Sequence, residues 1–181
     1  GETNQGLTAV AIGGAAGSTD QGTGALAVGY GAGYTGQGVD TVAVGKSAGR
    51  TNQGVSAVAV GESAGYTTQS ANAVALGFEA GKTTQGNSAV AIGKEAGETT
   101  QGTKAVAIGS LAGKVNQGNE AVALGNLAGF GNQAANSIII NATGTMLDNI
   151  VADTFVVKPI RNLAMTTILG YNAATGEVTH N

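Results

Sequence analysis

The sequence of 181 residues contains no cysteine, no tryptophan and a single proline. Without cysteine, the chain can form neither disulfides nor thiol-based catalytic groups. A collagen-like triple helix is excluded, because the 32 glycines do not recur at every third position and proline is nearly absent. Four tyrosines and three phenylalanines are the only aromatic residues, so few large side chains are available for a compact globular core.

Charge is also scarce. Charged residues make up 10% of the chain and the net charge is −3, which leaves no basic patch for nucleic acid or an anionic membrane. No apolar run approaches the roughly 20 residues of a membrane-spanning helix. The only histidine is His180, and the carboxylates share no repeated spacing suited to acid-base chemistry. We therefore expect no nucleic-acid partner, no membrane insertion, no cofactor or metal site and no enzymatic activity.

The sequence does contain a sixteen-residue repeat, which is clearest in residues 83–98 (TTQGNSAVAIGKEAGE). Eight full copies follow one another without insertion or deletion, and an incomplete ninth copy starts at Gly131 and ends after Ile140. The full copies start at Thr3, Thr19, Thr35, Thr51, Thr67, Thr83, Thr99 and Val115. A fixed period of this length indicates a solenoid, and repeat positions 1 to 16 are counted from these residues.

Repeat positions 7 to 10 have the pattern of a strand. Branched residues at positions 8 and 10 alternate with alanine at positions 7 and 9, and an invariant glycine follows at position 11. A second, more polar strand is expected between positions 12 and 3. These features predict an all-β fold, a parallel β-roll or β-solenoid of sixteen-residue coils that rise about 4.8 Å each. Both strand faces are apolar, so we expect neighbouring chains to cover the alanine face of a homo-oligomer.

Repeat position 3 is always glutamine, and glutamines stacked at the coil spacing can form an amide ladder. We predict this structural role for Gln5, Gln21, Gln37, Gln53, Gln69, Gln85, Gln101, Gln117 and Gln133. An alternative is that the threonines of position 1 bind an ordered surface such as ice. Against this alternative, Val115 interrupts the threonine column, and glutamine occupies the place of a second regular threonine.

Positions 2, 5, 6, 12 and 16 vary freely and are expected to face solvent. Their larger residues are candidate contacts with a host-surface receptor or glycan, namely Tyr30, Tyr34, Arg50, Tyr66, Phe78 and Phe130.

The stretch Asn87-Ser-Ala-Val-Ala-Ile-Gly-Lys-Glu-Ala96 resembles the head repeat of trimeric autotransporter adhesins, the YadA-like head, and variants of it recur at 56–64 and 72–80. The resemblance covers residues 3 to about 140. It implies a left-handed parallel β-roll with three chains around one axis. The uniform sixteen-residue period and the Thr-x-Gln-Gly segment depart from the bacterial heads, which typically have shorter repeats.

After Ile140 the repeat ends, so we divide the chain into a β-roll over 1–140 and a connector with a C-terminal β cap over 141–181. Residues 155–157 are expected to form a strand that ends at Pro159, and 168–171 and 177–179 to form a hairpin. The motif Asn141-Ala-Thr143 fits a glycosylation sequon. A stack needs a cap at its open end, and the expected cap residues are Phe155, Ile160, Leu163, Met165, Ile168, Leu169 and Tyr171.

Three tail segments, 137–144, 155–162 and 168–180, resemble viral and phage fibre proteins just before an endosialidase-type intramolecular chaperone. That resemblance implies trimerisation and release of the chaperone near Asn181. The expected function is that of a structural or adhesive segment of a trimeric virus or phage fibre, on a virion or cell surface. The alternatives are the head of a bacterial trimeric autotransporter adhesin and an ice-binding β-solenoid that uses its threonine columns.

Overall fold

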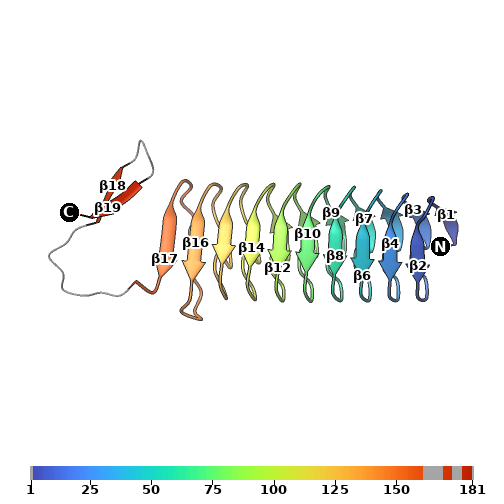
Figure 1. Ribbon diagram of the computed structural model, residues 1–181. Coiled ribbons are helices and arrows are strands. Elements are labelled where there is room, and N and C mark those ends of the chain that lie inside the picture. The colour runs from blue at the N-terminus through green and yellow to red at the C-terminus, as the bar shows by residue number, and fades with distance from the viewer. Residues whose placement is uncertain (1, 161–168, 173–176, 181) are drawn as a thin grey trace.

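The computed structural model describes residues 2–160, 169–172 and 177–180, with side chains described up to residue 160. Over residues 2–160 the chain winds into a parallel β-solenoid whose coils stack in a single row (Figure 1). Strands pair with their equivalents sixteen residues away, as in Val74 with Val90 and Ala75 with Ala91. The predicted all-β solenoid of sixteen-residue coils is therefore confirmed.

Two sheets run along the solenoid. The ten-stranded sheet is built mainly from repeat positions 8 to 10 and contains β2 (Val10–Ile12), β4 (Leu26–Val28), β6 (Val42–Val44), β8 (Val58–Val60), β10 (Val74–Leu76), β12 (Val90–Ile92), β14 (Val106–Ile108), β15 (Val122–Leu124), β16 (Ile138–Asn141) and β17 (Phe155–Lys158). The seven-stranded sheet is built from repeat positions 1 to 3 and contains β1 (Thr3–Gln5), β3 (Thr19–Gln21), β5 (Thr35–Gln37), β7 (Thr51–Gln53), β9 (Thr68–Gln69), β11 (Thr84–Gln85) and β13 (Thr100–Gln101).

The interior of the solenoid is lined by alanine. Ala59 of position 9 and Ala64 of position 14 have no exposed surface, and their equivalents are buried along most of the stack. The two sheets approach so closely that only methyl groups and the position-3 glutamines lie between them. The expectation that chains associate through the alanine face is therefore wrong, because each coil buries that face itself.

The branched residues of positions 8 and 10 face outward instead. None of them is buried, and several are well exposed, including Leu76 at 43% and Leu124 at 42%. We call this surface of the ten-stranded sheet the outer apolar face. It comprises Val10, Ile12, Leu26, Val28, Val42, Val44, Val58, Val60, Val74, Leu76, Val90, Ile92, Val106, Ile108, Val122, Leu124, Ile138, Ile140, Phe155 and Val157.

Each coil turns at two corners, and the glycine of position 11 is essential at one of them. Gly61 has a φ of 129°, which only glycine adopts readily. A Cβ atom there would lie 2.5 Å from the carbonyl oxygen of Gly77 in the next coil. The turn closes with a hydrogen bond from the Ala64 amide to the Gly61 carbonyl, at 3.3 Å. The invariant glycine therefore allows adjacent coils to stack at this corner.

The residue at position 2 sets the length of the second strand. In the first coils, asparagine or aspartate there adopts a left-handed conformation, and the strand has three residues, as at Asn52 with a φ of 54°. Where position 2 is threonine, as at Thr68, the residue is not left-handed and the strand shortens to two residues. β-Branched side chains disfavour left-handed backbone, which accounts for the difference.

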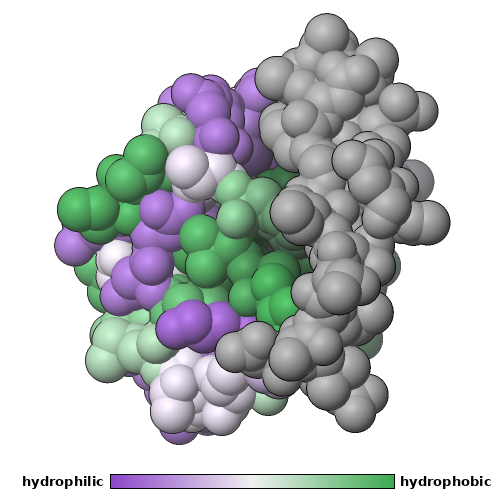
Figure 2. All heavy atoms as spheres, turned by 90° about the vertical axis from the view of Figure 1, so that its left-hand side faces the viewer, coloured by the Kyte–Doolittle hydropathy of each residue, from purple (hydrophilic) through white to green (hydrophobic). Residues whose placement is uncertain are grey.

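The parallel ladder extends beyond the boundary expected at residue 140, because β17 pairs with β16. The interior at this end is filled by Ile139 and Leu147, which are 0% and 8% exposed, with Val156 packed against them. Phe155 and Ile160 are 62% and 71% exposed, so these two residues do not cap the interior as expected. Figure 2, which views the solenoid along its axis from this end, shows hydrophobic residues gathered both centrally and at one edge.

The other expected cap residues, Leu163, Met165, Ile168, Leu169 and Tyr171, have side chains outside the described part of the chain, as do His180 and Asn181. The predicted hairpin is present in the backbone, where β18 (Leu169–Asn172) pairs antiparallel with β19 (Glu177–His180). The sequon asparagine, Asn141, is 3% exposed and donates hydrogen bonds to the carbonyls of Asn126 and Thr145. Its amide is therefore inaccessible to glycosylation in the folded chain.

Candidate functional site

The position-3 glutamines form a column inside the solenoid. From Gln21 to Gln133 they are at most 2% exposed, whereas Gln5 in the first coil is exposed. The Nε2 atom of Gln69 donates to the Val58 carbonyl on the opposite sheet at 2.7 Å and to the Ala73 carbonyl at 3.2 Å. Position 15 is glycine beside this column, and a Cβ atom at Gly65 would lie 2.8 Å from Gln69 Oε1.

Amide-to-amide hydrogen bonds join the glutamines from Gln53 to Gln133. The Nε2 of Gln69, for example, lies 3.1 Å from the Oε1 of Gln85. Nearer the N-terminus, Gln21 and Gln37 donate to backbone carbonyls. The column therefore bonds to the ten-stranded sheet at every coil from Gln21 to Gln133. It also links successive coils over five steps.

A second column runs along the surface at position 16, and we call it the corner column. Its members are Ser18, Tyr34, Arg50, Tyr66, Lys82, Glu98, Lys114 and Phe130. Since equivalent positions pair across coils, each side chain lies beside the members sixteen residues before and after it. The corner column therefore brings residues that are distant in sequence into direct contact.

Arg50 lies between two aromatic rings of the corner column. Its guanidinium carbon is 5.4 Å from the centroid of the Tyr34 ring and 5.3 Å from that of Tyr66. One guanidinium nitrogen donates a short hydrogen bond to the Tyr66 hydroxyl. No carboxylate among the described residues forms an ion pair with Arg50. The two rings hold the guanidinium in place by cation–π attraction, and no described carboxylate compensates its charge.

Three of the predicted contact residues line one surface pocket of about 280 Å³. The pocket spans the first three coils, with Ala15 in the first, Tyr30 and Tyr34 in the second and Arg50 in the third. Its lining consists of Ala15, Tyr30, Gly31, Tyr34, Ser47 and Arg50. Tyr30 is 69% exposed and Tyr34 38% exposed, so both rings are accessible from solvent.

The other predicted contact residues do not line this pocket. Tyr66 covers the far side of Arg50, and Phe78 is 44% exposed in a later coil. Phe130 lies near the end of the corner column, where the Lys114 ammonium is 5.7 Å from its ring centroid. The structure thus brings Tyr30, Tyr34, Arg50 and Tyr66 together and leaves Phe78 and Phe130 apart.

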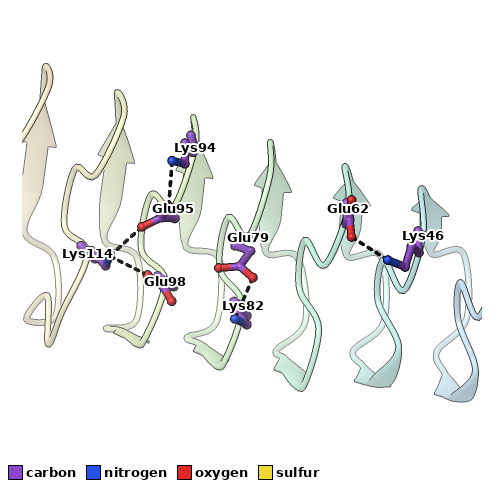
Figure 3. Close-up of polar contacts among 8 residues, drawn as sticks. All are labelled: Lys46, Glu62, Glu79, Lys82, Lys94, Glu95, Glu98 and Lys114. Carbon is purple, nitrogen blue, oxygen red and sulfur yellow. Dashed lines mark hydrogen bonds and ion pairs between the residues drawn. The ribbon is translucent and has the colours of Figure 1, made fainter.

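Further along the same corner, charged residues form ion pairs (Figure 3). Lys114 Nζ lies 2.6 Å from Glu95 Oε2 and 3.2 Å from Glu98 Oε2. The hydrogen bond from Lys114 is the main reason why the pKa of Glu95 is lowered, and the same bond raises the pKa of Lys114. Glu98 Oε2 makes no aligned hydrogen bond, so its contact with Lys114 is electrostatic. Lys82 pairs with Glu79 at 2.8 Å, and Lys46 with Glu62 at 2.9 Å.

The threonine columns do not form a regular array. Position 1 is half-buried at Thr19, Thr35 and Thr51. Between β7 and β9 only Gln53 and Gln69 remain in register, because the strand starts one residue later from Thr68 onward. The backbone geometry required for a lattice-matched threonine surface therefore changes midway along the stack.

The aromatic residues and Arg50 were predicted from the sequence, but their partners were not. Ser47 in the pocket and the Glu95–Glu98–Lys114 cluster follow from the period, because positions 13 and 16 of adjacent coils are neighbours.

Within the described ranges, no group of three His, Cys, Asp or Glu side chains is placed to hold a metal ion. In the same part of the chain, no helix is long and apolar enough to cross a lipid bilayer. Comparison of the chain with protein-family models, curated proteins and solved structures gave no match.

Proposed function

We propose that this chain is a structural and adhesive segment of a trimeric fibre of a virus or phage, in which three solenoids pack side by side. One observation carries the proposal. The outer apolar face presents branched side chains on all ten strands of the larger sheet, and nothing in the described chain covers it. A contiguous exposed apolar surface on a secreted or surface protein marks a protein interface.

The outward face of the seven-stranded sheet is polar, which also favours packing of the solenoids through the outer apolar face. Its outward residues at position 2 are Asn, Asp, Gly or Thr, and Asn52, Thr84 and Thr100 are exposed. A chain with one polar and one apolar outer sheet face buries the apolar one most simply against copies of itself. The number three comes from the resemblance to trimeric adhesin heads and to fibre proteins. A rigid rod of this kind holds its surface contacts at a fixed distance from the rest of the fibre.

The test is a pair of matched double variants. Val74→Glu with Val90→Glu places two carboxylates on the outer apolar face, whereas Thr84→Glu with Thr100→Glu places two on the other sheet. Burying unpaired carboxylates in an interface costs several kcal/mol each. We expect the valine variant to sediment as a monomer and the threonine variant to sediment as the unmodified chain does. Retention of the unmodified sedimentation coefficient by the valine variant would contradict the proposed interface.

A further inference from the structure

The pocket on the first three coils has the chemistry of a binding site for an acidic sugar. We infer that Tyr30, Tyr34, Ser47 and Arg50 bind a carboxylated monosaccharide unit, such as a sialic acid or a uronic acid at the end of a surface glycan. This inference rests on the attachment role proposed above and specifies the ligand that such attachment uses. Neither catalysis nor a metal ion is involved.

The cation of the site is available for a ligand. Tyr34 and Tyr66, in the coils before and after Arg50, lie beside its guanidinium, whose carbon is 5.4 and 5.3 Å from their ring centroids. Its edge carries the N–H donors, and among the described contacts a single donor is used, toward the Tyr66 hydroxyl. A guanidinium edge with free parallel donors matches a carboxylate in bidentate geometry. Fixed between two rings, Arg50 also loses little conformational freedom when it binds a ligand.

The remaining lining suits the rest of a sugar. Exposed tyrosine rings offer flat surfaces for the C–H groups of a pyranose, and their hydroxyls can donate to or accept from its hydroxyl groups. Ser47 also lines the pocket, and its side chain adds another hydroxyl. A volume of about 280 Å³ is near the lower limit of small-molecule sites, and it suits one monosaccharide rather than a longer chain.

Lys114 offers a comparison within the same corner column. It too lies beside an aromatic ring, that of Phe130, at 5.7 Å. Its ammonium, however, is paired with Glu95 and Glu98 at 2.6 and 3.2 Å. A carboxylated ligand would have to displace these two carboxylates, so Lys114 is not expected to bind it. The difference between Arg50 and Lys114 is that no acidic partner of Arg50 occurs among the described side chains.

Tyrosine fluorescence reports directly on this site. The chain has no tryptophan, and three of its four tyrosines, Tyr30, Tyr34 and Tyr66, surround the pocket or Arg50. Tyr171→Phe removes the fourth, so the signal of that variant comes from the site alone. The full chain carrying this change is titrated with the methyl glycoside of sialic acid, with glucuronate, with glucose and with inorganic phosphate.

We expect saturable fluorescence changes with one or both carboxylated sugars below about 10 mM, and none with glucose over the same range. Arg50→Gln should weaken binding at least tenfold, while Lys114→Gln should leave it unchanged. Saturation by phosphate as tight as by the sugars would indicate a simple anion site and overturn the inference. Equal binding of glucose, absence of any saturable change, or an unaltered affinity in Arg50→Gln would also overturn it.

A second variant distinguishes loss of sugar binding from loss of the fold. Ser47→Leu fills the pocket with a side chain that the same repeat position carries at Leu111 and Leu127, where φ is also left-handed. We expect this variant to lose binding and keep its thermal stability. Sedimentation of the same samples separates the two proposals. A monomer that binds the sugar would contradict the trimer alone, and a trimer that binds no sugar would contradict the site alone.

Discussion

The side-chain amide of Gln69 donates a hydrogen bond to the main-chain carbonyl of Val58, which lies 2.7 Å away on the opposite sheet and in the preceding coil. The same nitrogen lies 3.1 Å from the amide oxygen of Gln85 in the following coil. One buried side chain therefore contacts both adjacent coils and both sheets. In an interior lined by alanine methyl groups, such hydrogen bonds are the main directional contacts between the sheets.

We predict that Gln69→Glu destabilises the chain in a pH-dependent manner. A carboxylate at this buried site has no hydrogen to donate to the carbonyls of Val58 and Ala73. Burial would also raise its pKa. The cost, about 2–4 kcal/mol at pH 7, is present above the raised pKa and decreases as the pH falls and the carboxyl protonates.

Chemical denaturation at pH 7 and pH 4 measures this effect. Gln5→Glu is the matched control, because Gln5 lies in the exposed first coil. The control should change stability little at either pH. A Gln69→Glu deficit that does not shrink at pH 4 would show that charge burial is not its cause.

Gly61→Ala is predicted to destabilise the solenoid by about 2–4 kcal/mol, because the backbone there is left-handed at a φ of 129° and the added methyl meets the Gly77 carbonyl at 2.5 Å. Gly131→Ala provides the control, since its nearest contact would be a side-chain oxygen of Asp148 at 3.6 Å. Thermal unfolding followed by circular dichroism compares the two. Equal melting temperatures for both variants would contradict the proposed role of position 11.

The Glu95–Lys114 ion pair should contribute modestly to stability, about 1 kcal/mol at neutral pH, because both side chains are partly exposed. The pKa of Glu95 is lowered in the folded chain, so its contribution is present above the unfolded value of about 4.3 and is lost as the pH falls through the folded value. Unfolding of Glu95→Gln across pH 2–7 tests this prediction. Glu62→Gln, which removes a more exposed pair with Lys46, should have almost no effect at any pH.

The period made much of this fold predictable. Invariant residues at fixed spacing placed Ala59, Gly61 and Gln69 at equivalent points of successive coils, and strand alternation separated Val58 and Val60 from Ala59. The sequence did not show which strand face turns inward, because that depends on how far apart the two sheets lie. The tight corners bring the sheets close, so alanine fits inside and valine does not.

The candidate site was only partly predictable for a related reason. Variable positions identify outward residues, but the contacts among them depend on side-chain directions at the corner. Tyr34, Arg50 and Tyr66 share repeat position 16, so their stacking follows from the register. The participation of Ser47 requires the left-handed turn at position 13, with a φ of 56°, which the residue type alone does not indicate. The burial of Ile139 and Leu147 in the last coil could not be predicted from the period, because the repeat is lost there.

If three solenoids associate through the outer apolar face as proposed, the mass of the assembly in solution reveals it. Sedimentation equilibrium of the unmodified chain over a hundredfold range of concentration gives this mass independently of shape. We predict three times the 17.4 kDa mass of one chain, unchanged on dilution. A mass of 17.4 kDa throughout, with the chain fully folded, would contradict it.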